Sequence, residues 1–302
     1  MKLFEAEQKI KEQLKNIYEA QEAENIADLA SEYITSLCKN ERRANKEILL
    51  TPEQLSIMNK TLQQLLSHEP IQYVMNKCWF FGMELFIDHS VLIPRPETEE
   101  LVSWVIDDVK KKGYNVFNAG SMKADVTSQL KIIDVGTGSG CIALALKKNM
   151  PRAEVWGCDI SEEALNIARR NGSSLNIRVD FQGVNFLDHA QQKHLPSVDI
   201  VVSNPPYVPL RDKDQMAANV LNFEPHTALF VSDEDPPQFY RALANFGKHR
   251  LHKEGTMYME IHEGLGHEVV ELFQTEGYNG VELRKDMQGK DRMVKAERGV
   301  GS

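Results

Sequence analysis

The chain has 302 residues, of which 42% are hydrophobic, and a formal net charge of -9; this length suffices for two modest domains that each bury a core. Binders of nucleic-acid backbone usually carry a basic face, so the acidic balance argues against a DNA or RNA substrate. The sequence shows no signal peptide, no membrane-length apolar run and no cysteine–histidine spacing typical of metal sites, so we expect a cytoplasmic protein without a metal.

Residues 1–75 carry the pattern of a small helical bundle. Apolar residues recur at helical spacing over residues 3–17 and again over residues 26–34. Thr51 followed by Pro52 is typical of a helix start, with threonine as the cap and proline in the first turn. Arg42, Arg43 and Lys46 form a small basic cluster, which we expect on a solvated helix face.

Residues 76–96 change in character and are interpreted as a linker. Aromatic and aliphatic residues surround Gly82, which predicts a β-hairpin. Pro94 and Pro96 then favour an extended segment, because each proline keeps the preceding residue out of the α region. Arg95 between them has two interpretations: an ion pair with a nearby acid, or a segment 94–98 that borders a ligand pocket.

Residues 97–302 are predicted to form an α/β domain. A helix over residues 97–112 and a surface loop over residues 113–129 come first. Short apolar runs then alternate with helical patterns, which indicates a parallel sheet covered on both faces. We predict strands at residues 131–135, 154–158, 177–179, 198–202 and 255–260, and helices at residues 141–148, 162–171 and 266–276.

The loop after the first of these strands has glycine at alternate positions, 136, 138 and 140. Glycines there let backbone N–H groups approach a ligand closely. A dinucleotide-binding loop would read G-x-G-x-x-G, whereas this loop reads G-x-G-x-G and resembles the first motif of S-adenosylmethionine methyltransferases. Asp159 ends the next strand, where a carboxylate can accept hydrogen bonds from both hydroxyls of a ribose. An adenosine-containing ligand is therefore expected, with NAD as the lesser alternative.

Asn204-Pro205-Pro206-Tyr207 follows the predicted strand at residues 198–202. One interpretation is a rigid turn with a packed tyrosine, because two prolines end a strand's hydrogen-bond ladder. The chemistry favours another. The Asn204 side-chain oxygen and the Pro205 carbonyl can accept hydrogen bonds from both N–H groups of a planar amide or amine, with the Tyr207 ring beside it. Catalysis would then be mostly positioning, without a histidine base.

With these motifs in order, the chain resembles the HemK/PrmC family, the glutamine N5-methyltransferases of peptide chain release factors. The matching segments are residues 69–73, 92–99, 203–207, 223–225 and 289–292. The resemblance implies a Rossmann-like, seven-stranded methyltransferase domain preceded by a helical domain that helps to dock the release factor. It also implies S-adenosylmethionine as cofactor and, as substrate, the glutamine of the Gly-Gly-Gln motif in class 1 release factors.

The resemblance also implies the roles of individual residues. Asn204 and Pro205 are the expected catalytic residues. Substrate binding is expected at Asn204, Pro205, Pro206 and Tyr207, and cofactor binding at Gly136, Thr137, Gly138, Ser139, Gly140, Asp159, Asn185 and Asn204. Either Asn185 or Phe186 occupies the position that lies beside the adenine in the family. Val184 stands just before it, where the family carries an acidic residue. Residues 232–237 also lack the glycine-containing turn expected there.

Two other functions remain open at this point. A nucleic-acid methyltransferase for adenine or guanine amino groups could use the same acceptors. However, residues 1–90 hold ten Lys/Arg and fourteen Asp/Glu, a poor match to duplex DNA. A protein-binding module that keeps the fold without activity is the second alternative, since a fold alone does not prove function. We expect release factors as partners, with no direct nucleic acid and no membrane.

Overall fold

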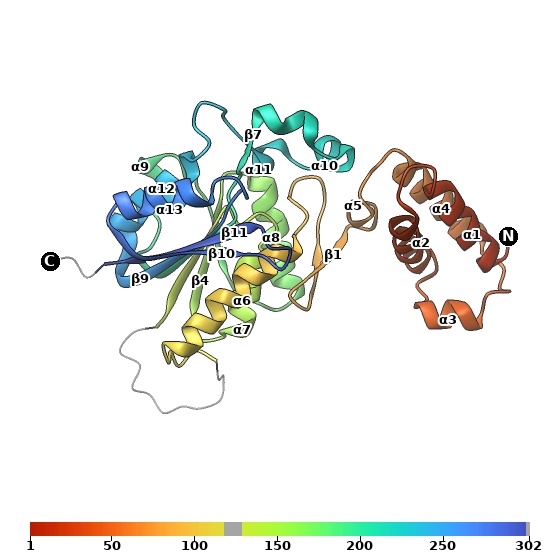
Figure 1. Cartoon of the computed structure of the whole chain (residues 1–302). Coiled ribbons are helices and arrows are strands. Elements are labelled where there is room, and N and C mark those ends of the chain that lie inside the picture. Colours follow the sequence, from red (N-terminus) through yellow and green to blue (C-terminus); the bar gives the residue numbers. More distant parts are fainter. Residues whose placement is uncertain (118–128, 300–302) are drawn as a thin grey trace. The chain divides into compact units, whose positions relative to one another are not determined.

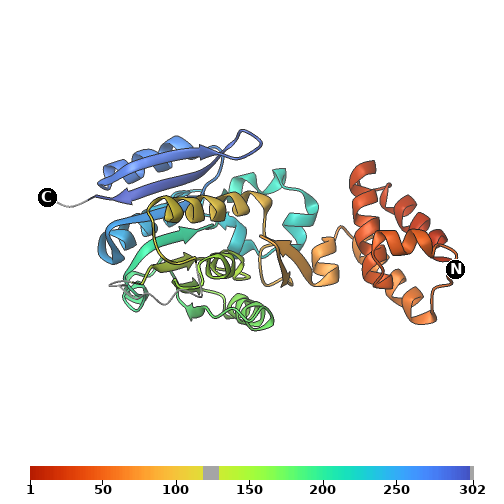
Figure 2. The same cartoon turned by 90° about the horizontal axis from the view of Figure 1, so that it is seen from below.

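The computed structural model describes residues 1–117 and 129–299, so that residues 118–128 of the predicted surface loop lie outside the described part (Figures 1 and 2). The chain divides into two compact units. One comprises Met1–Lys77 and Met216–Phe223, and the other comprises Cys78–Gln215 and Glu224–Ser302.

The first unit is helical, as the apolar periodicity predicts. Its helices are α1 (Leu3–Leu14), α2 (Ala20–Thr35), α3 (Lys39–Ala44), α4 (Pro52–Leu66), α5 (Ile71–Met75) and, from later in the chain, α10 (Ala218–Phe223). Thr51 caps α4 as predicted, because its hydroxyl accepts a hydrogen bond from the Gln54 backbone N–H at 3.1 Å. Ile10, Leu14 and Leu65 are among the side chains buried where these helices pack together.

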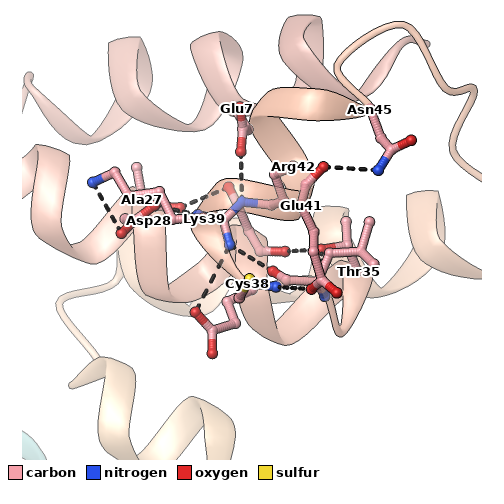
Figure 3. Close-up of polar contacts among 12 residues, drawn as sticks. Glu7, Ala27, Asp28, Thr35, Cys38, Lys39, Glu41, Arg42 and Asn45 are labelled. Carbon is pink, nitrogen blue, oxygen red and sulfur yellow. Dashed lines mark hydrogen bonds and ion pairs between the residues drawn. The ribbon is translucent and has the colours of Figure 1, made fainter.

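Arg42 lies inside this helical unit, so the prediction of a solvated basic cluster is wrong for this residue. Its side chain is 2% exposed. The guanidinium donates to Glu7 Oε1 at 2.7 Å and to the Leu37 carbonyl at 2.7 Å, and it also pairs with Asp28 (Figure 3). A buried charge requires such partners, and acidic residues of α1 and α2 supply them. Arg43 and Lys46 are exposed, as expected.

The predicted hairpin forms from β1 (Lys77–Phe80) and β2 (Met83–Phe86). The two strands alternate between buried and more exposed side chains along their length. Phe81 and Gly82 form the turn in left-handed conformations, with φ of 49° and 67°. Gly82 tolerates such a φ without steric cost, which explains why glycine stands at this point.

The second unit has an α/β architecture with a Rossmann-like, seven-stranded sheet, as predicted. Its order is β10-β11-β9-β6-β3-β4-β5. Strands β9, β6, β3, β4 and β5 run parallel, whereas β11 and β10 continue the sheet antiparallel. The strands are β3 (Lys131–Val135), β4 (Glu154–Asp159), β5 (Asp180–Gly183), β6 (Val198–Ser203), β9 (Leu251–Glu260), β10 (Tyr278–Lys285) and β11 (Asp291–Arg298), with a separate parallel pair β7 (Val208–Pro209) and β8 (Phe230–Val231).

Helices cover both faces of this sheet. Helices α6, α7 and α8 lie along one face and α12 and α13 along the other (Figure 1). Trp104 of α6 packs edge-on against Tyr258 of β9, with ring centroids 5.6 Å apart, and Phe246 of α12 packs against Phe186 on the other side. The helices and the short 3-10 helix η1 are α6 (Pro96–Lys111), α7 (Cys141–Asn149), α8 (Glu162–Ser174), α9 (His189–Gln192), η1 (Leu210–Gln215), α11 (His226–Leu229), α12 (Gln238–Arg250) and α13 (Gly266–Thr275).

The third predicted strand is displaced in the structure. Residues 177–179 do not pair, and β5 begins at Asp180. The cause lies at the end of α8, where Asn176 adopts a left-handed φ of 54° and the Ile177 N–H donates to the Gly172 carbonyl at 2.8 Å. These residues are still closing the helix C-terminus, so strand pairing starts later. No helix in the described part of the chain is long and apolar enough to cross a membrane.

Candidate active site

Two loops meet at the carboxyl ends of the neighbouring strands β3 and β6. The chain passes from β3 through β4 to β5 on one side and then crosses back to β6 on the other. Such a reversal of strand order opens a crevice at the carboxyl edge of an α/β sheet, where ligands bind. Ser203 at the end of β6 donates its hydroxyl to the Val135 carbonyl at 2.8 Å, which ties the two strand ends together.

A cavity of about 340 Å³ opens at this edge. The predicted site residues that line it follow four different strands: they are Gly136, Gly138, Asp159, Asn185, Asn204, Pro205 and Pro206. Four other predicted site residues, Thr137, Ser139, Gly140 and Tyr207, are not among its lining residues. The fold therefore brings residues from distant parts of the sequence to one place.

The glycine loop adopts a backbone that side chains other than glycine rarely accept. Gly136, Gly138 and Gly140 have φ of 72°, 52° and 80°. A Cβ on Gly140 would also lie 3.1 Å from the Cβ of Ala168, so this residue lets α7 begin close against α8. A Cβ on Gly136 would lie 3.9 Å from the Asn204 carbonyl oxygen. The two predicted motifs therefore lie side by side.

Buried polar groups hold the glycine loop from beneath. Asp134 is fully buried, and its Oδ2 accepts hydrogen bonds from the Thr137 hydroxyl at 2.6 Å and the Ala143 N–H at 3.2 Å. Burial raises the pKa of Asp134 to about 7, although these hydrogen bonds oppose the shift. The Asn171 side chain donates to the Ser139 carbonyl at 3.0 Å. Thr137 and Ser139 thus have buried side chains and belong to the support of the loop.

Asp159 ends β4 at the rim of the cavity. Its Oδ2 accepts a hydrogen bond from the Gly138 N–H at 2.9 Å, and its Oδ1 accepts one from the Ser161 N–H at 3.0 Å. Burial raises the pKa of this carboxyl, and the two backbone donors oppose that rise. A carboxylate has about four lone-pair sites, so each oxygen can still accept a hydroxyl of a ribose.

An apolar wall stands beside Asp159. Val184 and Phe186 are 6% and 5% exposed and both line the cavity, as does Ile160. Asn185 lies between the first two, and its side-chain oxygen accepts the Leu187 N–H at 3.1 Å. A flat aromatic ligand fits such a surface, because apolar contact holds it with few hydrogen bonds.

The Asn204 side chain has a defined orientation. Its Nδ2 donates to the Thr98 hydroxyl at 3.1 Å, which leaves Oδ1 as the outward hydrogen-bond acceptor of this amide. Pro205 adds a backbone carbonyl whose position is fixed by its own ring and by Pro206 after it. A pair of oxygen acceptors at one strand end can receive both N–H groups of a planar NH₂ group.

The Tyr207 ring lies outside the cavity lining. Its hydroxyl donates to Glu260 Oε1 at 3.1 Å, and the ring meets His262 edge-on with centroids 6.1 Å apart. Burial raises the pKa of Tyr207, so the phenol stays protonated and donates. Burial lowers the pKa of His262, which keeps this imidazole neutral beside the tyrosine.

Arg95 pairs with Glu224, so the prediction that this arginine pairs with a nearby acid is confirmed. The Arg95 guanidinium lies 2.5 Å from Glu224 Oε1, and the Ile93 N–H donates to Glu224 Oε2 at 3.3 Å. Burial raises the pKa of Glu224, whereas Arg95 acts in the opposite direction. The ion pair joins two segments that lie 129 residues apart and holds the residues just before it, including Val91 and Leu92, at the cavity wall.

Sequence reasoning did not find Thr98 and Glu260 as part of the site. Both are buried, and they join Asn204 and Tyr207 through hydrogen bonds. Thr98 belongs to residues 92–99, one of the segments that carry the family resemblance. Its role in the site, however, depends on Glu260, which lies 162 residues away. Among the described residues, no group of three or more His, Cys, Asp or Glu could hold a metal ion.

The lining residues fit S-adenosylmethionine. Gly136 and Gly138 leave open the space that a Cβ would take, which suits a close approach of the ligand to the backbone. Asp159 offers acceptors for the ribose, and Val184 and Phe186 offer an apolar surface for the adenine. Asn204 follows at the end of the same cavity, so its acceptors lie beside the cofactor-binding residues.

Comparison with known proteins agrees with this class of site. Two family models match: the Methyltransferase small domain at residues 119–229 and the PrmC N-terminal domain at residues 5–75. The crystal structure of the hMettl16 catalytic domain in complex with the MAT2A 3'UTR hairpin 6 has a TM-score of 0.54 at 16% identity, covering 74% of this chain and 77% of that one. This likeness shows the fold alone. Fold and site together define a methyltransferase.

Two curated relatives identify the particular family. A release factor glutamine methyltransferase of Flavobacterium psychrophilum is 37% identical over 93% of this chain and 94% of its own length. One of Bacteroides thetaiotaomicron is 38% identical over 96% of this chain and 98% of its own length. The chain belongs to the release factor glutamine methyltransferase family.

Proposed function

We propose that this protein transfers a methyl group from S-adenosylmethionine to the side-chain amide nitrogen, N5, of the glutamine in the Gly-Gly-Gln motif of class 1 release factors. The observation that carries this proposal is the proximity of the two motifs, with Asn204 beside Gly136 at adjacent strand ends. The curated relatives are named for the same reaction.

The residues of the site suit an amide substrate. An amide nitrogen is a poor nucleophile because its lone pair is delocalised into the carbonyl. Asn204 Oδ1 and the Pro205 carbonyl can accept its two N–H groups, which raises electron density on nitrogen and aims it. S-adenosylmethionine supplies the methyl group already activated on a sulfonium. The protein's part is therefore positioning, with rigid acceptors that need little reorganisation during the reaction.

Gly136, Gly138 and Asp159 hold the cofactor in this proposal, with Asn185 by the adenine, while Pro206 and Tyr207 complete the substrate pocket. Thr137, Ser139 and Gly140 contribute by shaping the glycine loop. Residues 1–75 serve as the substrate-docking domain, residues 76–96 as linker and residues 97–302 as the methyltransferase domain. We place the protein in the cytoplasm, with release factors as partners and without direct contact to nucleic acid or membrane.

The test uses labelled S-adenosylmethionine, a purified release factor and mass spectrometry to locate the label. We expect label on the glutamine of Gly-Gly-Gln and none on a release factor whose glutamine is replaced by alanine. DNA and RNA are incubated in parallel. Label on nucleic acid alone would contradict the proposal and favour an amino-methyltransferase. Cofactor binding without any transfer would favour a silent binding module.

A further inference from the structure

A single buried carboxylate connects both ends of the Asn204–Tyr207 motif. Glu260 ends β9, the neighbour of β6 in the sheet, and is 1% exposed. Its Oε2 accepts the Thr98 hydroxyl at 2.7 Å, and its Oε1 accepts the Tyr207 hydroxyl at 3.1 Å. Thr98 in turn accepts the Asn204 Nδ2 at 3.1 Å. Thr98 is itself 2% exposed, so its hydroxyl is shielded from water.

The direction of each hydrogen bond follows from the number of protons. A threonine hydroxyl has one proton, and an ionised carboxylate can only accept. Burial raises the pKa of Glu260, whereas the hydrogen bonds from Thr98 and Tyr207 and the charge of Arg292 oppose that rise and favour the ionised form. The Thr98 proton therefore goes to Glu260, which leaves only lone pairs to face Asn204. Asn204 must then present its NH₂ group to Thr98 and its Oδ1 to the opposite side. If the Asn204 amide were turned by 180°, it would have almost the same shape, but its NH₂ group would face the substrate. The substrate nitrogen also carries N–H donors, so no hydrogen bond could form between the two groups.

We propose that Thr98 and Glu260 are positioning residues that fix the direction of the Asn204 amide so that its oxygen faces the substrate nitrogen. This inference rests on the proposed function, because it needs a substrate that donates N–H groups. The same carboxylate holds the Tyr207 hydroxyl, so one side chain orients the first and the last residue of the motif. Neither Thr98 nor Glu260 lines the cavity.

The central experiment replaces Thr98 with valine, which has nearly the same shape but no hydroxyl. In the Thr98→Val protein the Asn204 amide has no partner that distinguishes its two ends. We expect kcat for release factor methylation to fall about tenfold, the value of roughly one hydrogen bond. The Kd of S-adenosylmethionine is expected to stay within about twofold of that of the unsubstituted protein, because the cofactor-binding residues are unchanged. The Tm should fall by a few degrees, because the buried Glu260 carboxylate loses a hydrogen bond, which costs about 1–3 kcal/mol.

Thr98→Ser is the matched control, because serine keeps the hydroxyl and loses only a methyl group. It should restore kcat to within about threefold of the original value. Glu260→Gln is the second probe. The glutamine amide can present either a donor or an acceptor to Thr98, so the direction of the Thr98 hydroxyl is no longer fixed. We therefore expect kcat to fall in this variant too, while the Kd of S-adenosylmethionine stays unchanged. Single-turnover rates of Thr98→Val in the Asn204→Ala background should show no further loss, since the two residues act through one group.

The outcomes separate this inference from the proposed function. If the original protein leaves the Gly-Gly-Gln glutamine unlabelled, both the proposed function and this inference are overturned. If it labels that glutamine and Thr98→Val keeps the original kcat, the positioning role alone is overturned. Equal losses of kcat in Thr98→Val and Thr98→Ser, or additive losses with Asn204→Ala, would likewise overturn it, because they would point to packing instead of to the hydroxyl.

Discussion

Replacing Asp134 with asparagine tests whether the carboxylate beneath the glycine loop makes stability depend on pH. Burial raises its pKa from 3.8 to about 7. In the unfolded chain the carboxyl returns to its ordinary value, so between these pH values the native state binds more protons than the unfolded state. The protonated Asp134 carboxyl therefore stabilises the native state fully below about pH 4, and this stabilisation is lost as the pH rises through about 7.

The magnitude follows from the separation of the two pKa values. At about 1.4 kcal/mol for each pH unit, a pKa of 3.8 in the unfolded chain and of about 7 in the native state gives roughly 4 kcal/mol. Asparagine does not titrate, and its Oδ1 can still accept from Thr137 and Ala143. Its Nδ2 replaces an oxygen without a hydrogen-bond partner in the described structure, which costs about 1–3 kcal/mol at every pH. Asp134→Asn should thus be destabilising near pH 4 and stabilising near pH 8.

Urea denaturation of both proteins at about pH 5, 6, 7 and 8 measures this difference. Asp188→Asn is a suitable control. Asp188 is a half-buried N-cap whose pKa is lowered by hydrogen bonds from Ala190 and Gln191, so the effect of this substitution should be constant over this pH range. A difference between Asp134→Asn and the original protein that stays constant from pH 5 to 8 would refute the reasoning.

Three further predictions concern the cofactor site and the helical unit. Asn204→Ala should lower the rate of methyl transfer by about two to three orders of magnitude, while calorimetry still finds S-adenosylmethionine bound; equal loss of both would contradict its role as substrate acceptor. Gly140→Ala should weaken cofactor binding about tenfold, because its Cβ would lie 3.1 Å from the Ala168 Cβ and would shift the glycine loop by which the cofactor is held. Gly113→Ala has the same kind of backbone strain, with φ of 75°, but open space around it, and should leave that Kd unchanged. Arg42→Met should lower the free energy of unfolding, measured in urea titrations, by about 2–3 kcal/mol. The loss stays moderate because the carboxylates that Arg42 pairs with are about a third exposed and remain partly hydrated. Arg43→Met, at an exposed position, should change the free energy of unfolding little.

The parts of the fold that the sequence predicted are those with a strong local signal. Apolar runs marked β3 and β6, and Thr51-Pro52 marked the start of α4. The antiparallel strands β10, at the edge of the sheet, and β11, next to it, gave no such signal, because they bury fewer positions and tolerate many charged residues. Arg42 shows the same limit, since a buried arginine and an exposed one have the same local sequence pattern until acidic residues of other helices are placed around it.

The residues of the site also differ in whether they carry a local sequence signal. Gly136 and Asn204 could be predicted because each stands in a motif of fixed local spacing at the end of a strand. The Thr98–Glu260 pair could not, since a buried carboxylate at the end of β9 becomes part of the site only when β9 lies next to β6. That pairing decides which end of the Asn204 amide faces the substrate. The motif therefore supplies the acceptor, and the sheet order gives it a direction, so a protein with Asn-Pro-Pro-Tyr in another strand order would need another group to orient the amide.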